Sequence, residues 1–255
     1  MESIKLYSAI SSTNGLPPTK AVIDREALAK NFSILNKKIT QCSPKTEIIS
    51  VVKADAYGHS CELCAPTLAA VGCRRFAVSS IGEASALRHI LDGHGYHDAE
   101  ILILGYTPTD NVALLLGNRI TQCVFSLDYA KELSDALDGR IKIHIKLDTG
   151  MNRLGIRAES NADIQSAVSE IKQIALLKNL EIEGMFTHFP RSDEATDEGD
   201  AFTREQYRLF SAVRSELQKS GMEIPFCHVC NSAGAVRFPE FALDGVRVGI
   251  LLYGG

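Results

Sequence analysis

The feature that most constrains the fold of this chain is a regular alternation of short apolar runs with longer segments of helical spacing. Such an alternation is typical of βα units and of a parallel sheet. The runs are nearly continuous rather than alternately polar, which indicates strands covered on both faces. The apolar runs are residues 21–24, 48–53, 76–78, 101–104, 123–125, 141–147, 183–188, 226–230 and 246–252. The helical segments include residues 24–39, 81–91, 127–137, 162–174 and 203–219.

The nine runs are one more than an eight-stranded barrel needs, and the 255 residues match the length of one α/β barrel. The run 21–24 is the odd one, because the polar segment before it gives it no barrel partner. We therefore predict a TIM-like (β/α)8 barrel with an extra N-terminal strand. A doubly wound open sheet remains the alternative, because periodicity does not separate the two architectures. Residues 1–19 are predicted to form a flexible tail and residues 20–255 the barrel domain.

Composition argues against several classes of function. The chain has 27 Lys and Arg against 31 Asp and Glu, a net charge of −4, so it has no basic excess for binding nucleic acid. No apolar stretch approaches the roughly 20 residues that cross a membrane, and the N-terminus does not resemble a signal peptide. The seven cysteines are odd in number and not densely spaced, which favours reduced thiols in the cytoplasm.

Two further patterns in the sequence do not predict a site. The pairs Cys61/Cys64 and Cys227/Cys230 lie roughly 160 residues apart, far beyond the spacing of a zinc ribbon, so we predict no metal. The first pair falls on a predicted helix and the second on a strand. The acidic run 192–200 is predicted to be an exposed loop at a strand end.

Polar residues at the carboxyl ends of the predicted strands are the candidates for chemistry, because parallel barrels place their functional groups there. Lys53 follows a buried run, where removal from water favours the neutral amine of a Schiff-base nucleophile. A lysine that merely extends from a strand end to solvent is the alternative. His144, Lys146 and Asp148 alternate along one strand and should point into the barrel. Asp148 is the obvious partner for Lys146, so a structural ion pair is as open as a functional site.

Three later residues complete the candidate set. His188 ends another run, where a core histidine is the more frequent finding. Ser232 and Gly249 follow the last runs, and small residues with free backbone N–H groups at that position suit phosphate binding. Ser and Gly are also ordinary turn residues, so each signal alone is weak.

Taken together, five segments resemble the alanine racemases, which are pyridoxal-phosphate-dependent enzymes of fold type III. The segments are VVKADAYGH at 51–59, HIKLDTGMNRLG at 144–155, FTHF at 186–189, HVCNSA at 228–233 and VRVGILLYG at 246–254. They occur in the family's order from about residue 20 onwards. The resemblance implies a barrel that binds pyridoxal 5'-phosphate and acts on a small amino acid. It also implies interconversion of L- and D-alanine for peptidoglycan by two-base proton transfer through a lysine aldimine.

The resemblance also implies roles for residues at the cofactor's phosphate and at its reactive carbon. Lys53 would hold the cofactor as an internal aldimine and act as one of two catalytic bases. Tyr57, Ser232 and the backbone around Gly249 and Ile250 would hold the phosphate.

Four further residues are assigned to the ring and the substrate by the same resemblance. Arg247 would face the pyridine nitrogen, and His188 would orient Arg247. Arg153 would lie near the phenolic oxygen and the substrate carboxylate. Lys146 matches a position that is carbamylated in many relatives, and the resulting anion would orient Arg153.

The sequence departs from the family pattern after Tyr253. Relatives continue into a mostly β C-terminal domain, which supplies a tyrosine as the opposite base and completes the site in a homodimer. We therefore expect a barrel-only fragment, without that β domain or tyrosine, that is inactive or nearly so alone. Two alternatives stay open: a non-catalytic barrel of pyridoxal-phosphate homeostasis, and the serine racemase domain of a larger protein.

Overall fold

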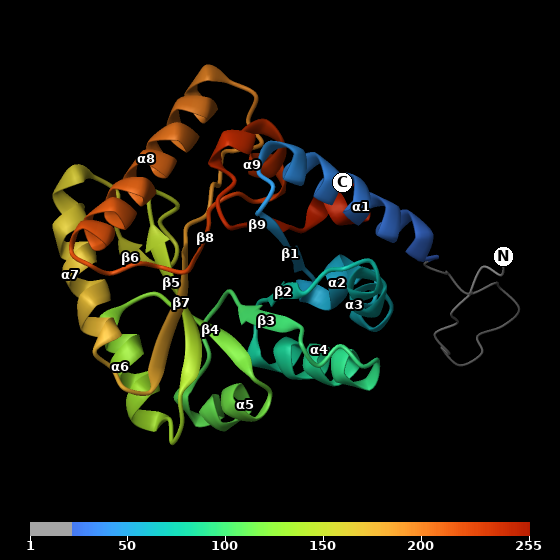
Figure 1. Cartoon of the computed structure of the whole chain (residues 1–255), viewed down its shortest axis with the longest axis horizontal. Helices are drawn as coiled ribbons and strands as arrows, with labels where there is room; N and C mark the ends of the chain where they lie inside the picture. Colours follow the sequence, from blue (N-terminus) through green and yellow to red (C-terminus); the bar gives the residue numbers. More distant parts are fainter. Residues whose placement is uncertain (1–21) are drawn as a thin grey trace, which may run out of the picture.

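The computed structural model describes residues 22–255, which form a closed barrel of eight parallel strands with helices around it (Figure 1). Going round the barrel, the strands follow the order β1-β2-β3-β4-β5-β7-β8-β9, and β9 pairs with β1. This closure excludes the doubly wound open sheet. The barrel strands are β1 (Glu47–Val51), β2 (Arg75–Val78), β3 (Glu100–Ile103), β4 (Ile120–Val124), β5 (Ile141–Asp148), β7 (Leu180–Phe186), β8 (Phe226–His228) and β9 (Gly245–Val248).

The helices follow the strands along the chain and lie outside the barrel (Figure 1). Asp24, Ser80, Ser126 and Thr196 each accept a backbone N–H at the first turn of a helix, as good N-cap residues do. The helices are α1 (Arg25–Cys42), α2 (Lys53–Gly58), α3 (Cys61–Ala70), α4 (Ile81–Gly93), α5 (Val112–Gly117), α6 (Leu127–Ala136), α7 (Ile164–Ala175), α8 (Asp197–Lys219) and α9 (Ser232–Arg237). No helix within residues 22–255 has both the length and the apolar character that crossing a membrane requires.

A ninth strand is present, but not where the sequence pattern placed it. It is β6 (Ile156–Arg157), which pairs with the end of β5. Residues 22–24 form no strand, because the Asp24 carboxylate accepts the Ala27 N–H at 2.9 Å and starts α1. Ala21 and the predicted tail at 1–19 lie outside the described residues.

Two other boundaries differ from the prediction. The run 246–252 is split, since β9 ends at Val248 and a 3₁₀ turn follows at Ile250–Tyr253. The acidic run 192–200 is not simply an exposed loop. Ser192 is fully buried, and α8 begins at Asp197, where carboxylates are favoured beside the positive end of the helix dipole.

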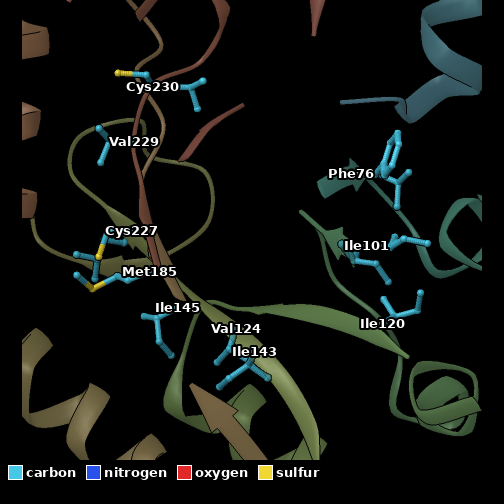
Figure 2. Close-up of a cluster of buried hydrophobic side chains, with 14 of the residues drawn as sticks. Phe76, Ile101, Ile120, Val124, Ile143, Ile145, Met185, Cys227, Val229 and Cys230 are labelled. Atoms are coloured by element: carbon cyan, nitrogen blue, oxygen red, sulfur yellow. The ribbon is translucent and has the colours of Figure 1, made fainter. Parts of the chain in front are cut away.

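Alternation along the strands separates an apolar outer face from a partly polar interior. Figure 2 shows the outer layer, with Ile143 and Ile145 of β5 among buried apolar side chains of neighbouring strands. His144, Lys146 and Asp148 alternate with the apolar residues of β5, so they lie on its opposite face, and they are buried inside the barrel, as predicted. A small apolar cluster completes the interior: Ile49, Val51, Ala77, Leu102 and Phe226. The barrel interior is therefore where charged groups are held out of water.

Candidate active site

A cavity of about 720 Å³ lies at the carboxyl ends of the barrel strands. Every residue to which the resemblance assigns a role lines this one cavity, although these residues are spread over most of the chain, whereas His144 and Asp148 do not line it. They are Lys53, Tyr57, Lys146, Arg153, His188, Ser232, Arg247, Gly249 and Ile250. The structure thus places them together, while their individual roles stay predictions.

Lys53 stands where the chain leaves β1 and enters an unusual backbone conformation. The segment α2 is a left-handed turn, since Ala54, Asp55, Ala56 and Tyr57 have φ of 51° to 55°. This conformation costs roughly 1–2 kcal/mol for each residue that has a Cβ. Four such residues in succession, directly after a candidate nucleophile, are the kind of strain that gathers at functional sites.

The carboxylate of Glu83, in the first turn of α4, holds this strained turn in place. Its Oε1 accepts the Ala54 N–H at 2.8 Å, and its Oε2 accepts the N–H and the hydroxyl of Ser79, each at 2.7 Å. Asp55 in turn accepts the Cys61 N–H at 2.6 Å. The ends of β1 and β2 are thereby tied together, which limits where Lys53 can lie. The sequence analysis missed Glu83, whose role depends on two strands meeting at one edge.

Tyr57, Ser232 and Gly249 form a group of hydrogen-bond donors at another part of the cavity. The Gly249 N–H donates to the Ser232 hydroxyl at 3.0 Å. A Cβ at Gly249 would overlap the Tyr57 hydroxyl, so glycine is what lets this hydroxyl lie against the backbone here. Burial raises the pKa of Tyr57, which keeps its hydroxyl a donor at neutral pH. Ile250 follows at the start of the 3₁₀ turn and is exposed.

Asp148 does not form the ion pair with Lys146 that the sequence suggested. Its Oδ1 accepts the N–H groups of Gly150, Met151 and Asn152 at 2.9–3.0 Å, and its Oδ2 accepts that of Arg153 at 3.1 Å. Both carboxylate oxygens are therefore occupied by backbone N–H donors of the loop after β5. This loop carries Arg153 to the cavity, so Asp148 serves the site by shaping the loop.

Lys146 is left as a buried amine without a carboxylate partner in the described part of the chain. Its Nζ donates to the Leu147 carbonyl at 3.1 Å and lies 5.6 Å from the centre of the Phe186 ring. Burial lowers the pKa of Lys146 to about 8, because the charged form loses its hydration. A substantial neutral fraction near physiological pH follows, and a neutral amine is the form that can react.

Arg247, at the end of β9, is held by a dense set of acceptors. Its Nη1 donates to Nδ1 and to the carbonyl of His228 at 2.7 and 2.8 Å. Its Nη2 donates to the carbonyls of Thr187 and Val229 at 2.7 and 3.0 Å. The contact from Nη2 to His188 Nδ1 is longer, at 3.5 Å.

His228, more than His188, is the imidazole that contacts Arg247, and the sequence analysis missed it. The available signal was its inward position on β8, two residues before Cys230 in the HVCNSA segment. Burial and the neighbouring Arg247 lower the pKa of His188 to about 3 and that of His228 well below its ordinary value. Both imidazoles are therefore neutral.

The cavity is strongly biased toward positive charge. Lys53, Lys146, Arg153 and Arg247 line it, while Asp193 supplies the one carboxylate among the described lining residues. None of the four cations forms a salt bridge within residues 22–255. No group of three or more His, Cys, Asp or Glu in that range is placed to hold a metal ion. The arrangement suits an anionic ligand beside a lysine.

Comparisons with known proteins identify relatives of this barrel. Residues 23–255 match the family described as alanine racemase, N-terminal domain. The alanine racemase of Clostridium novyi is 39% identical over 242 residues, and alanine racemase 1 of Clostridium acetobutylicum is 40% identical over 240. These alignments cover 94% and 93% of this chain and 58% of each relative.

Solved structures give the same result. The alanine racemase of Clostridium difficile 630 in complex with cycloserine superposes with a TM-score of 0.77 at 32% identity, over 89% of this chain and 60% of that one. The alanine racemase of Bacillus anthracis with bound L-Ala-P has a TM-score of 0.78 at 30% identity, over 91% of this chain and 57% of that one. The chain spans about 60% of the length of such relatives. It therefore belongs to the alanine racemase family, whose N-terminal barrel domain it matches.

Proposed function

We propose that this barrel binds pyridoxal phosphate on Lys53 and serves the interconversion of L- and D-alanine. The observation that carries the proposal is a set of four cations around one lysine-containing cavity, none of which has a carboxylate partner among residues 22–255. Lys146 and Arg247 are each only 4% exposed, and buried cations are costly unless something neutralises them. Together with Lys53 and Arg153 at the same cavity, this surplus of positive charge calls for an anionic ligand. The ligand should therefore be an anion, and it should be able to react with the lysine. A phosphate ester that also carries an aldehyde has both properties, since the phosphate is negatively charged and the aldehyde reacts with an amine.

The residues present fit this cofactor at each of its polar groups. Tyr57, Ser232 and the backbone of Gly249 and Ile250 would hold the phosphate, for which hydroxyl and N–H donors are the usual partners. The Tyr57 hydroxyl occupies the space that a Cβ at Gly249 would fill, so glycine at 249 lets this hydroxyl lie beside the other donors. Bound on a lysine, pyridoxal phosphate supplies an electron sink that makes the α-carbon proton of an amino acid acidic.

Arg247 would face the pyridine nitrogen through its Nε. Both Nη atoms are engaged by carbonyls and by imidazole nitrogen, whereas Nε has no hydrogen-bond partner among the described residues. A guanidinium donates but does not give up its proton. Arg247 would thus leave the pyridine nitrogen unprotonated, which weakens the electron sink and disfavours side reactions such as transamination.

Lys53 Nζ would move the α-carbon proton on one face of the substrate. Arg153, carried by the loop that Asp148 shapes, would hold the substrate carboxylate. Carbamylation of Lys146, whose pKa of about 8 leaves a reactive neutral amine, would give an anion that orients Arg153. Racemisation needs a second base on the opposite face. Tyr57, the one tyrosine lining the cavity among residues 22–255, lies beside Gly249 in the phosphate group.

The anchor is tested with Lys53→Arg and Lys53→Ala. The Arg variant keeps the positive charge and cannot form a Schiff base. We expect the wild-type chain mixed with pyridoxal phosphate to show visible absorbance, and borohydride to fix the added mass on the peptide that contains Lys53. Both variants should lose the absorbance and the modified peptide. Retention of the visible absorbance by Lys53→Ala would refute the assignment.

Turnover is tested separately by the circular dichroism of L-alanine. We propose that the chain alone with added cofactor racemises little or none, because the opposite base and a partner subunit are expected from outside residues 22–255. A full-length relative serves as the positive control. Racemisation by this chain at the rate of the control would contradict the need for a further base.

A further inference from the structure

A continuous line of hydrogen bonds runs through the barrel interior, from the amino end of the barrel to Arg247 at the carboxyl end. Glu183 on β7 contacts His144 Nε2 through its Oε2 at 3.3 Å. His144 Nδ1 lies 2.8 Å from His228 Nε2, and His228 Nδ1 lies 2.7 Å from Arg247 Nη1. Three of these four side chains are almost fully buried, so water does not compete for these contacts. The line connects a carboxylate at the amino end of the barrel to the candidate site at the carboxyl end.

The chemistry of arginine assigns every proton along this line. A guanidinium only donates, so His228 Nδ1 must accept and its proton must lie on Nε2. His228 Nε2 therefore donates to His144 Nδ1, which leaves the His144 proton on Nε2. His144 Nε2 then donates to the Glu183 carboxylate, which only accepts when it is ionised. One arrangement alone satisfies all three contacts, and it needs an anion at Glu183 and a cation at Arg247.

Packing holds both imidazole rings in the orientation that this arrangement requires. The His228 ring stacks on Phe186 with the ring centres 4.8 Å apart and an angle of 10° between the planes. A Cβ at Gly184 would come within 2.7 Å of His144 Nε2 and Cε1, so glycine is what makes room for that ring. The line of contacts is therefore built into the barrel.

Charged neighbours keep the two ends of the line ionised. Lys142 lies 2.6 Å from Glu183 and 3.4 Å from Glu100, and Arg75 also pairs with Glu100. Burial alone would raise the pKa of Glu183, but hydrogen bonds from His144 and Lys142 outweigh it and lower that pKa to about 2.

At the other end, burial lowers the pKa of Arg247 only to about 10, so it stays charged at neutral pH. His228 faces Arg247, His144, Arg75 and Lys146, all of which oppose a further positive charge.

We propose that Glu183 and His144 are positioning residues that, together with Arg247, hold His228 in one tautomer and one ring orientation, and so hold Arg247 with its Nε directed into the cavity. Only the identity of the group that Nε meets rests on the proposed function. The proton order itself belongs to the barrel and is open to measurement without any cofactor.

The direct test is nitrogen NMR on the chain labelled with ¹⁵N-histidine, without cofactor. His144 and His228 are each expected to show one protonated Nε2 and one bare Nδ1, unchanged from about pH 5 to about pH 9. A proton on His228 Nδ1, or titration of His228 within that range, would overturn the proposal. This measurement needs no variant beyond those used to assign the signals.

The variant test is Glu183→Leu, with Glu181→Leu as its matched control on the same strand. Glu181 is half exposed and reaches Arg140 only at 3.8 Å. Without the Glu183 acceptor, the His144 Nε2–H has no partner, so His144 should also populate the tautomer protonated on Nδ1, which cannot accept from His228. His228 should keep its Nε2 proton, because Arg247 still donates to its Nδ1, but its Nε2 signal should shift as the contact to His144 is lost. The control should keep the wild-type signals. A Glu183→Leu protein that folds and keeps the single His144 tautomer and the wild-type His228 signals would show that Glu183 does not position the two imidazoles. If the variant does not fold, the wild-type measurement still decides.

Discussion

The two ends of the barrel differ in whether their positively charged side chains are paired with carboxylates. At the amino end, Arg75 and Lys142 are each paired with carboxylates, Glu47, Glu100 and Glu183. At the carboxyl end, Lys53, Lys146, Arg153 and Arg247 form no salt bridge within the described residues. Lys146 and Arg247 are buried as well, so the positive charge at the carboxyl end favours the binding of an anion there, whereas the cations at the amino end are already paired. This difference in charge pairing between the two ends indicates that an anionic ligand binds at the carboxyl end.

The largest effect on stability is expected from Lys146→Met, which removes an unpaired buried cation. Lys146 is only 4% exposed, and burial lowers its pKa from 10.5 to about 8. That shift corresponds to a cost of about 3 kcal/mol in the folded state at neutral pH. Methionine fills a similar volume without the charge. We expect the free energy of unfolding in urea, without cofactor, to rise by about 2–3 kcal/mol at pH 7.

The pH dependence of this gain follows from the direction of the shift. Between about pH 8 and pH 10.5 the unfolded chain binds more protons at this lysine than the folded chain does, so wild-type stability rises with pH there. The advantage of Lys146→Met should therefore shrink through this window and disappear above it. The buffer must be free of carbon dioxide, because a carbamate would change the charge. A variant less stable than wild type at pH 7 would contradict the assignment of Lys146 as an uncompensated cation.

Gly249→Ala tests whether the unpaired end is shaped for a phosphate. The new Cβ would displace the Tyr57 hydroxyl and narrow the space beside Ser232. We expect the affinity for pyridoxal phosphate, measured by absorbance titration, to fall about tenfold, or about 1.4 kcal/mol. Gly82→Ala in α4 is the control, because its Cβ would meet nothing within 4 Å. Equal affinities in the two variants would place the phosphate elsewhere.

The smallest effect is expected at the paired end, from Lys142→Met. Its side chain is 46% exposed, so its pairs with Glu100 and Glu183 are screened by water. Glu183 keeps His144 and Glu100 keeps Arg75 after the change. Urea unfolding should show a loss of about 0.5–1 kcal/mol, opposite in sign to the gain at Lys146. A gain at both positions would remove the contrast between the two ends.

Much of the barrel could be predicted from local pattern. Eight of the apolar runs coincide with barrel strands, because continuous apolar sequence is what a strand buried on both faces requires. The same alternation correctly placed His144, Lys146 and Asp148 inside the barrel. The run 21–24 was misjudged because two apolar residues before a capping Asp24 look like a short strand. The small strand β6 could not be predicted, because two residues are too few to show a periodic pattern.

For the candidate site too, the residues could be predicted from the sequence, whereas several of their contacts could not. Lys53, Arg247 and the other site residues could be named because they fall in segments that resemble the alanine racemases, at or shortly after the ends of recognisable strands. The partner of Asp148 could not, since the carboxylate had a choice between Lys146 and four backbone N–H groups of the following loop. Glu83 and His228 were missed because their contacts join segments far apart in the chain.

The sequence by itself determined which segments become strands, which side of each strand faces inward, and which residue types reach the carboxyl ends. These properties depend on the period of the chain and on the local cost of burying apolar or polar groups. Only the tertiary structure decided how the interior charges are distributed between the two ends of the barrel. Closing the barrel brings Lys142 to Glu183, because pairing depends on which strands become neighbours. It leaves four cations without a carboxylate partner in the described part of the chain: Lys53, Lys146, Arg153 and Arg247.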